Sequence, residues 1–584
     1  MKGLPAIILA FFILNGCAVM RVPDFARVPE KPGTYPRFTS GDSLIGMLDE
    51  DRAGYDVFFY DLDLMLDPAR KELGGTVDIH FKAVSDLSEL RIDLYEKLRI
   101  TGMKLSGEEV PWARNERAVN VTLPGPLKPG HDYILTLQYW GKPTRAKNPP
   151  WGGGFVWRKD DDGNPWTGVA CETEGASLWF PCKDHLSDEP DSVRLSMTVP
   201  AGLTVVSNGI RQSHTSVKEK ERYTWLTRYP VNIYNITFYA GKYEHFSDTV
   251  LTPYGIINLD YYVLSQNLAR AKNHFLQVKD IINLYSGLYG PYPWMKEGFK
   301  LVESPFEGME HQTAIAYGSG FSNRAWLGGD YVIVHEAAHE WWGNAVSVSD
   351  FSDIWLHEGF ATYSEILFAE QTLGYENSLL YARYNIAASI KNRFPVAGPA
   401  GVSYWNSGDN DVYNKGAMIL HTIRNIVNDS TLFFDILKTF YSEHAAASHV
   451  TTEDFISVVE RKTGKNWRDF FEVYLYRREV PVLHWYYSPA VIEGASGPPA
   501  SNGGPVIAAK WTGVPEAFSM PVDLYCRENG VTVRIVVTTT PSLFYDERLI
   551  NCRKLTCNRR LSYFDAVTGI SVMEEAGAAG TGVK

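Results

Sequence analysis

Residues 331–343 read YVIVHEAAHEWWG, the most informative segment of the chain. The apolar run with two central alanines predicts a helix. On that helix His335 and His339 lie four residues apart and project from one face, so two imidazole nitrogens can share one tetrahedral Zn²⁺. Glu336 lies beside them, where it can hold the water at the open position of the metal. The H-E-x-x-H pattern therefore predicts a zinc site.

A second segment must complete this site, because a catalytic zinc needs three protein ligands and one exchangeable water. Residues 355–361 read WLHEGFA, and we expect a helix from about Trp355 to Gln371. Glu358 on this helix is the candidate third ligand. Glu365 is seven residues further on and shares nearly the same face, so it could orient a ligand histidine. The ligand types favour one zinc ion, although other divalent metals bind the same groups.

Composition describes a folded, multidomain protein. The chain has 584 residues, too many for a single hydrophobic core, and 45% of them are hydrophobic and 21% charged. The formal net charge is −12 and no basic stripe is present, so we do not expect nucleic acid as a partner.

The first residues are expected to be a targeting signal. An apolar run from Leu4 to Leu14 follows Lys2; it is too short to span a bilayer and has the length of a signal-peptide core. Residues 14–17 read LNGC and resemble a bacterial lipobox, which implies cleavage before Cys17 and lipid attachment to its sulfur. We therefore expect an exported lipoprotein of the bacterial cell envelope; the alternatives are an ordinary secretory signal or a membrane anchor.

The remaining chain predicts a multidomain α+β protein. Apolar residues alternate from position 51 to about 247, as at Phe58, Tyr60 and Leu62, which predicts an antiparallel β domain. Helical periodicity then dominates a catalytic domain up to about residue 482. The predicted organisation is a signal peptide (1–17), a tether (18–50), the β domain (51–247), the catalytic domain (248–482), a short C-terminal β-sandwich (483–575) and a disordered tail (576–584).

Smaller elements are also predicted. In the catalytic domain they are a helix over residues 266–288, a strand over 299–302 and an edge strand or loop over 306–312; in the sandwich they are strands over 506–511, 520–525 and 531–538. Five cysteines remain if Cys17 is lipidated, so at least one is free: Cys171, Cys182, Cys526, Cys552 and Cys557. The last three share one region and could include a disulfide, whose connectivity the sequence does not fix.

Several separated motifs make the chain resemble the aminopeptidase N family of gluzincin zinc metallopeptidases, which includes the leukotriene hydrolase/aminopeptidase. The zinc signature is His335, His339 and Glu358. The G-x-M-E-N exopeptidase motif of the family is similar to residues 307–311, EGMEH; its tyrosine before Lys-Gly corresponds to Tyr413; and its N-domain loop corresponds to Cys171-Glu172. The resemblance covers roughly residues 50–480 and implies a thermolysin-like catalytic domain with one Zn²⁺.

The resemblance also implies an activity and site roles. It implies an aminopeptidase that removes the N-terminal residue from peptides by attack of a zinc-bound water. Glu336 would take the proton of that water, and the Tyr413 phenol would stabilise the charge on the carbonyl oxygen. Glu310 and Glu172 would bind the free α-ammonium of the substrate. Gly308 and Met309 would contact the substrate, with Met309 in the lining of the S1 pocket.

Three residues depart from the family pattern. Glu307 stands in place of Gly, His311 in place of Asn, and His357 in place of Asn before the third ligand. The zinc and amine ligands are unaffected, so the reaction class is expected to survive while the substrate preference could differ. The large helical C-terminal domain of many members is also missing from the pattern.

Two other functions fit part of the sequence. A thermolysin-like endopeptidase shares the zinc signature but does not need Glu310 or a closed cleft end. A non-catalytic, peptide-binding lipoprotein would keep only the fold; the intact His335, Glu336, His339 and Glu358 argue against it. Epoxide hydrolysis, a side activity in the resembled family, has no signature of its own here.

Overall fold

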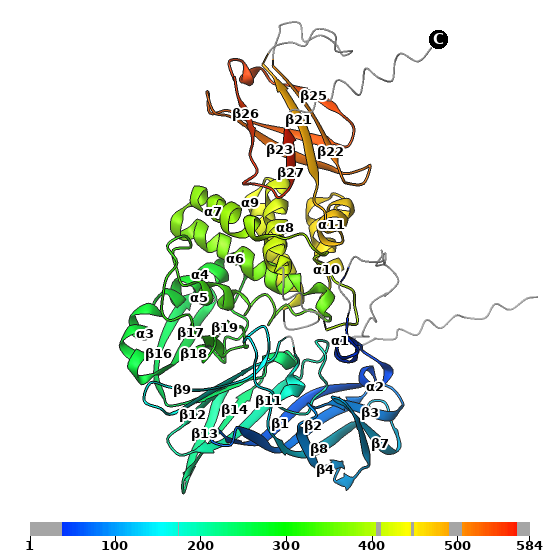
Figure 1. Ribbon diagram of the computed structural model, residues 1–584, viewed down its shortest axis with the longest axis vertical. Coiled ribbons are helices and arrows are strands. Elements are labelled where there is room, and N and C mark those ends of the chain that lie inside the picture. The colour runs from blue at the N-terminus through cyan, green and yellow to red at the C-terminus, as the bar shows by residue number, and fades with distance from the viewer. Residues whose placement is uncertain are drawn as a thin grey trace, which may run out of the picture.

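The computed structural model describes residue 35 and residues 38–172, 174–403, 410–445, 449–489 and 505–568. A β domain, a mainly helical domain and a small β domain follow one another along the long axis (Figure 1). The predicted signal peptide with Cys17, most of the Gly-rich loop before residue 505 and the tail 576–584 lie outside the described residues. Within the described ranges, no helix is long and apolar enough to cross a bilayer.

The N-terminal domain is built on an eight-stranded sheet. Its order is β13 (Ile210–Val217), β14 (Lys220–Thr227), β11 (Ser192–Pro200), β1 (Tyr55–Asp67), β2 (Glu72–Ala83), β8 (Asp132–Gly141), β4 (Leu98–Leu105) and β5 (Glu108–Glu109). The predicted alternation is present, since Tyr60, Leu62 and Leu64 of β1 are buried. The prediction of a purely antiparallel domain is wrong at one strand pair, because β1 and β11 run parallel.

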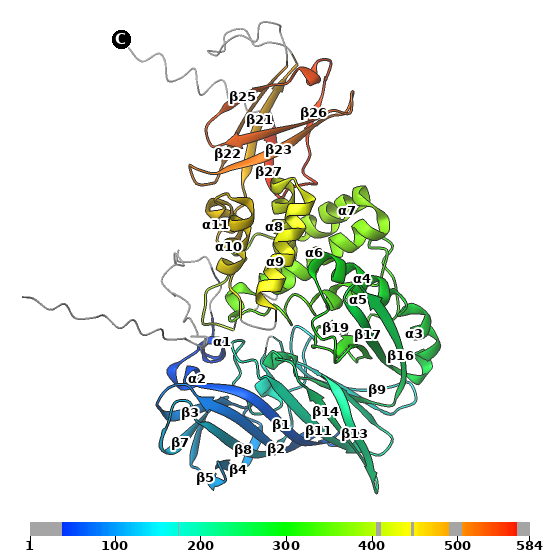
Figure 2. The same ribbon diagram turned by 180° about the vertical axis from the view of Figure 1, so that it is seen from behind.

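Two smaller sheets complete this domain. One has the order β12 (Thr204–Ser207), β15 (Phe238–Gly241), β10 (Pro165–Ala170) and β9 (Gly154–Lys159); the other has β3 (Leu87–Asp93), β7 (Ala118–Leu127) and β6 (Trp112–Asn115). Figure 2 shows β9 close to the helical domain, with β4 and β5 at the far end of the molecule.

The predicted tether is wrong from residue 38 onward. Helices α1 (Ser40–Gly46) and α2 (Glu50–Ala53) fold against the β domain, and we call residues 38–54 the N-terminal strap. Thr39 and Asp42 form a capping box at the start of α1, a signal that the Pro-rich composition upstream obscured. Gly46 of α1 is buried, which a solvated tether would not allow.

The predicted domain boundary at residue 247 also needs correction. It falls inside β16 (Tyr243–Thr252), whose partners belong to the catalytic domain. The sheet there has the order β16, β17 (Gly255–Leu264), β18 (Phe299–Glu303), β20 (Ile315–Tyr317) and β19 (Gly308–Met309). The boundary therefore lies before Tyr243; strand alternation continues across it and could not reveal it.

The catalytic domain also contains the helices α3 (Leu268–His274), α4 (Gln277–Tyr289), α5 (Tyr331–Ala338), α6 (Trp355–Leu373), α7 (Tyr375–Tyr381), α8 (Asp411–Val427), α9 (Ser430–His444), α10 (Thr452–Thr463) and α11 (Arg468–Leu475). Of these, α3, α4 and α5 contact the sheet. The single helix expected over residues 266–288 is two helices, interrupted at Phe275 and Leu276. The expected helix from Trp355 is confirmed as α6, two residues longer than predicted.

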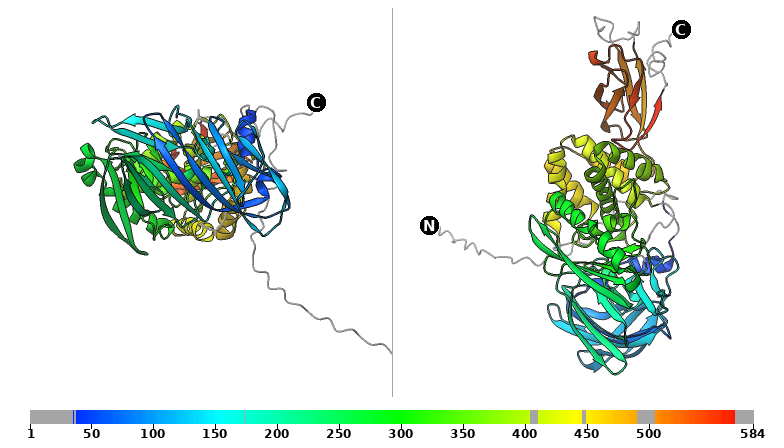
Figure 3. Two further views of the ribbon diagram at one scale, coloured as in Figure 1. Left: turned by 90° about the horizontal axis from the view of Figure 1, so that it is seen from below. Right: turned by 90° about the vertical axis from the view of Figure 1, so that its left-hand side faces the viewer.

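The C-terminal domain is a two-sheet sandwich, as predicted. One sheet has the order β25 (Ser542–Tyr545), β22 (Val506–Thr512), β21 (Val482–Ser488) and β27 (Asp565–Thr568); the other has β24 (Thr532–Thr538), β23 (Ser519–Cys526) and β26 (Leu555–Cys557). Cys526 and Cys552 form a disulfide, while Cys171, Cys182 and Cys557 are free. Figure 3 shows this sandwich beyond the helices, remote from the N-terminal domain.

Candidate active site

The three predicted metal ligands converge. His335 lies on α5, His339 caps its C-terminus, and Glu358 lies in the first turn of α6. The two Nε2 atoms are 3.2 Å apart, and Glu358 Oε2 lies 3.3 Å from one and 3.4 Å from the other. This Oε2 is buried without a hydrogen-bond partner of good geometry. Two imidazole nitrogens and one carboxylate oxygen facing each other are a donor set that zinc accepts.

The opposite edges of both imidazoles are held by the protein. His335 Nδ1 lies 2.8 Å from Glu365 Oε1, and His339 Nδ1 lies 2.8 Å from the carbonyl oxygen of Trp342. Tyr381 donates a hydrogen bond to the other oxygen of Glu365. Because both acceptors require a proton on Nδ1, the Nε2 lone pairs remain free for a metal. The residues therefore fit one Zn²⁺ held by His335, His339 and Glu358.

Glu336 reaches the site through a gap that a glycine leaves. Gly308 lies in β19, at the edge of its sheet, which confirms the edge strand or loop predicted over residues 306–312. A Cβ atom at Gly308 would lie 2.4 Å from Glu336 Oε1, so any larger residue would displace the carboxylate. Burial, opposed by the charges of His335 and His339, raises the pKa of Glu336 to about 8. A Zn²⁺ ion held by these histidines would lower this pKa and favour the ionised carboxylate that a general base needs.

Two further carboxylates, those of Glu172 and Glu310, lie beside the metal ligands. Oxygen atoms of Glu172, Glu310 and Glu358 lie within 4.8 Å of one another, and Tyr234 Oη donates a 3.0 Å hydrogen bond to Glu310. Burial raises the pKa of Glu310, and burial together with Glu310 raises that of Glu172 well above its ordinary value. Glu172 Oε1 has no hydrogen-bond partner. Buried carboxylates crowded in this way favour a cationic ligand between them.

Tyr413 completes the wall on the His335 side. It lies in the first turn of α8, and its ring centroid is 6.0 Å from that of His335. Trp151 from the N-terminal domain donates a 3.4 Å hydrogen bond to the Tyr413 hydroxyl. Burial holds the pKa of Tyr413 well above its ordinary value, so the hydroxyl keeps its proton and can donate it in a hydrogen bond.

An aromatic cleft of about 510 Å³ opens beside Tyr413. Among the described residues of its lining, the aromatic ones are Trp151, Trp326, Tyr331, Tyr381, Tyr384 and Tyr413. Glu365 is the only charged residue in that described part of the lining. Trp151 and Trp326 were not predicted, because they lie in loops where no periodicity marks a shared wall.

The three departures from the family pattern differ in burial. Burial lowers the pKa of both His311 and His357 to about 3, so both are neutral. His311 Nδ1 lies 2.7 Å from Tyr239 Oη, and His357 Nε2 accepts a 2.9 Å hydrogen bond from Val348 N. Glu307 is exposed. Both histidines are thus packed within the protein and add no charge to the site.

All predicted site residues except Cys17 lie together in this region, including the buried Met309 of β19. Cys17 lies outside the described residues.

Comparison with known proteins identifies two matching domain families. The Peptidase M1 N-terminal domain matches residues 58–234, and the Peptidase family M1 domain matches residues 328–474. The "Probable aminopeptidase 2" of Sulfurisphaera tokodaii is 23% identical over 406 residues, which cover 66% of this chain and 50% of that protein. Aminopeptidase B of Mus musculus is 29% identical over 186 residues, which cover 29% of this chain and 28% of that protein. The chain thus spans half or less of the length of these curated relatives.

Solved structures match over more of their length. The M1 zinc metallopeptidase of Deinococcus radiodurans is 26% identical with a TM-score of 0.60, and the match covers 73% of this chain and 94% of that one. A mutant of that enzyme bound to a Tyr-Ser-Ala substrate is 25% identical with a TM-score of 0.60, covering 72% and 94%. Matching models for both domains, the zinc signature and this shared fold show that the chain belongs to peptidase family M1.

Proposed function

We propose that the protein is a zinc-dependent aminopeptidase that removes the N-terminal residue from peptides. One observation carries this proposal: the carboxylates of Glu172 and Glu310 lie in the same site as the zinc ligands, with Glu172, Glu310 and Glu358 within 4.8 Å. A free α-ammonium bound between Glu172 and Glu310 would bring the first peptide bond to the metal ligands. Peptides with a free N-terminus are therefore the proposed substrates.

The chain supplies a group for each chemical task. When bound, Zn²⁺ provides a Lewis acid that polarises a carbonyl and lowers the pKa of water toward ~7. Glu336 accepts the proton of the attacking water and returns it to the leaving amine. The Tyr413 hydroxyl donates a hydrogen bond to the carbonyl oxygen as negative charge develops there. Loss of one such donor typically costs roughly 10²–10³ in rate.

The endopeptidase alternative fits the amine end of the site poorly. In an endopeptidase complex, a neutral chain segment would lie against Glu172 and Glu310. Those buried carboxylates would then have no cation to compensate them, which is energetically costly.

Turnover of matched peptides tests the proposal. Free-amine peptides and their N-acetylated forms are incubated with wild type, Glu336→Gln, Glu310→Gln and the control Glu307→Gln, an exposed neighbour of Glu310. We expect wild type to cleave free-amine peptides only. Glu336→Gln should lower kcat by a factor of about 10²–10⁴, and Glu310→Gln should raise KM. The control Glu307→Gln should behave as wild type. Equal cleavage of acetylated peptides would instead identify an endopeptidase, and no turnover by zinc-loaded protein would favour a binding protein.

We also propose that the protein is an exported bacterial lipoprotein, attached to a membrane of the cell envelope by lipid on Cys17. The support is the sequence alone: the apolar run from Leu4 to Leu14 followed by LNGC. Cys17→Ser should abolish incorporation of labelled fatty acid and release the protein from the membrane fraction. Unchanged labelling in that variant would refute the anchor.

A further inference from the structure

We propose that the N-terminal strap, residues 38–54, forms the wall that closes the amine end of the substrate cleft, and that Arg52 is the positioning residue that holds this wall. The inference rests on the proposed aminopeptidase function and deepens it. It explains why the site would admit an N-terminal residue but nothing upstream of it.

The wall encloses a very small cavity lined by Glu172, one of the two carboxylates proposed to bind the amine. The cavity has a volume of about 20 Å³, and a space of this size holds about one water molecule. Its lining brings together Glu172 and Tyr234 with Ile45 and Gly46 of the strap. Neither His335 nor His339 belongs to the lining. A substrate bound through its ammonium would therefore direct any upstream group into a space that is too small for it.

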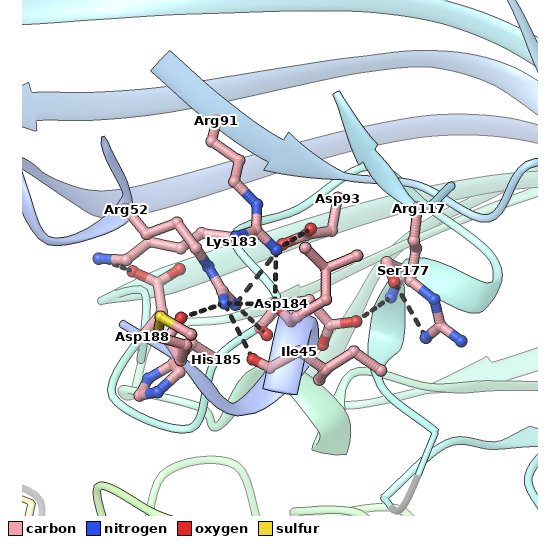
Figure 4. Close-up of polar contacts among 12 residues, drawn as sticks. Ile45, Arg52, Arg91, Asp93, Arg117, Ser177, Lys183, Asp184, His185 and Asp188 are labelled. Atoms are coloured by element: carbon pink, nitrogen blue, oxygen red, sulfur yellow. Dashed lines mark hydrogen bonds and ion pairs between the residues drawn. The ribbon is translucent and has the colours of Figure 1, made fainter. Parts of the chain in front are cut away.

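Arg52 fastens the strap to the β domain. Its Nη1 donates to two carbonyl oxygens at the end of α1, those of Ile45 at 2.9 Å and Met47 at 2.7 Å, and lies 3.3 Å from that of Leu44. Its Nη2 donates to the Asp184 carbonyl and lies 3.5 Å from Asp93 Oδ2. Figure 4 shows Arg52, Ile45 and Asp184 together in this cluster. One buried guanidinium thus links the wall residue Ile45 to the loop that carries Asp184.

Arg91 makes a second connection of the same kind. Its Nη2 donates a 2.6 Å hydrogen bond to the Leu44 carbonyl, and its Nη1 lies 2.7 Å from Asp49. Because the last carbonyl groups of a helix lack partners within it, these guanidinium groups satisfy the end of α1 and fix its position.

The strap also contacts the catalytic domain. Ser403 N donates a 2.9 Å hydrogen bond to the Asp42 carbonyl. A Cβ atom at Gly46 would lie 2.2 Å from Ser403 N, and the Gly46 carbonyl is 3.2 Å from His185 Nε2. Gly46 is therefore packed between His185 of the β domain and Ser403 of the catalytic domain. Figure 1 shows α1 at this junction.

Two variants test the wall in the full-length, zinc-loaded protein. Ile45→Ala enlarges the cavity by trimming a half-buried side chain, and Arg52→Met removes the fastening. Lys300→Met is the matched control: Lys300 is also buried and donates to a backbone carbonyl, that of Gly209 at 2.6 Å, but it does not touch the strap. The measurement is kcat/KM for one tripeptide and for its N-formyl derivative.

In wild type we expect strong preference for the free amine. The preference is the kcat/KM for the free peptide divided by the kcat/KM for the formylated one. Both strap variants should reduce this ratio by about tenfold or more, which is a loss of discrimination in the transition state. Lys300→Met should leave the ratio unchanged. A purely structural role of Arg52 would lower both activities together and leave the ratio constant.

The outcomes separate this inference from the proposed function. An unchanged ratio in Ile45→Ala, with normal turnover of the free peptide, overturns the wall but keeps the aminopeptidase. If Arg52→Met does not fold, Ile45→Ala decides alone. Failure of wild type to cleave the free peptide, or equal cleavage of both forms, overturns the proposed function and the wall with it.

Discussion

The orientation of His335 depends on one carboxylate. Glu365 accepts a hydrogen bond from Nδ1, and this contact fixes the tautomer that leaves Nε2 free for zinc. We therefore expect Glu365→Leu to lower zinc affinity by about 10–100-fold, as loss of such a partner typically does. Competition with a chromogenic chelator measures this affinity.

The control for this measurement is Glu370→Leu on the same helix. Glu370 pairs with Arg424 and contacts neither histidine, so its loss should leave zinc affinity unchanged. Equal affinities for wild type and Glu365→Leu would show that helix packing alone orients His335.

At the residue scale, helical spacing explains what the sequence could predict. His335 and His339 are four residues apart and Glu365 is seven after Glu358, so each pair shares a helix face. Glu172 gives no such signal; only the family resemblance singled it out. Trp151 could not be predicted, because its contact with Tyr413 joins positions 262 residues apart in different domains.

At the element scale, two glycines set the distance between α6 and α8. A Cβ atom at Gly416 would lie 2.9 Å from the Gly359 Cα atom, so the helix backbones touch there. Helix α6 carries Glu358 and α8 carries Tyr413, so this contact also sets their separation. We expect Gly416→Val to destabilise the protein by about 1–3 kcal/mol, the usual cost of overpacking, and to lower activity further than stability explains.

Denaturant unfolding and turnover at a temperature where the variant is folded check this prediction. Gly287→Ala on α4 is the control, since its added Cβ would meet no atom within 4 Å. Normal activity in folded Gly416→Val would show that the helices can separate without disturbing the site.

The aromatic cleft predicts a preference on the leaving-group side. If Glu172 and Glu310 hold the amine as proposed, it would lie near His339, which is close to Glu310. The chain beyond the scissile bond would then extend past His335 and Tyr413 into the cleft. Trp326 stacks on Tyr381 with ring centroids 5.2 Å apart and is 44% exposed, which leaves area for a substrate side chain. Trp326→Ala should reduce kcat/KM for peptides with Phe at the second position by about tenfold, the scale of one aromatic contact.

The same variant should leave peptides with Gly at the second position unaffected. A competition assay with the two peptides in one reaction measures the ratio directly, free of errors in enzyme concentration. Equal losses for both peptides would place the second residue outside the cleft.

The predicted elements were most accurate where one periodicity extends over many residues. The α6 prediction began at the correct residue, and the three sandwich strands were each placed within about a residue of their observed ends. The break between α3 and α4 was missed because Phe275 and Leu276 continue the apolar pattern. The strap was missed because its stability comes from Arg52 and Arg91, contacts that arise only after the β domain has folded.

At the scale of the whole molecule, the site is a shared product of two domains. The helical domain supplies the zinc ligands and Glu310, while the β domain supplies Glu172, Trp151 and, through the strap, the end wall. Family resemblance predicted the order of the domains, but the joint between them depends on side chains that no local pattern marks.

Zinc removal should therefore affect the stability of the folded protein as well as its activity. Without a cation, burial raises the pKa of Glu336 to about 8, and burial, overcome by Glu358 and Glu310, leaves that of His339 raised to about 9. Both groups hold protons more tightly when folded than when unfolded. Because the folded apo-protein binds more protons, its stability falls as pH rises from about 4.5, the ordinary pKa of Glu336, to about 9.

A metal held by His335, His339 and Glu358 would displace the extra proton of His339 and, by its charge, lower the pKa of Glu336, so it would remove this penalty. A ligand whose free concentration is a thousand times its dissociation constant raises the free energy of unfolding by about 4 kcal/mol. The zinc-loaded protein should therefore melt at a higher temperature than the protein treated with chelator. The gap should widen from pH 6 to pH 8, since zinc also competes with protons less at the higher pH. Thermal unfolding with and without chelator at both pH values measures the gap, and re-addition of Zn²⁺ but not Mg²⁺ should close it. A gap that is equal at both pH values would mean that the carboxylates and histidines are not the groups that the metal stabilises.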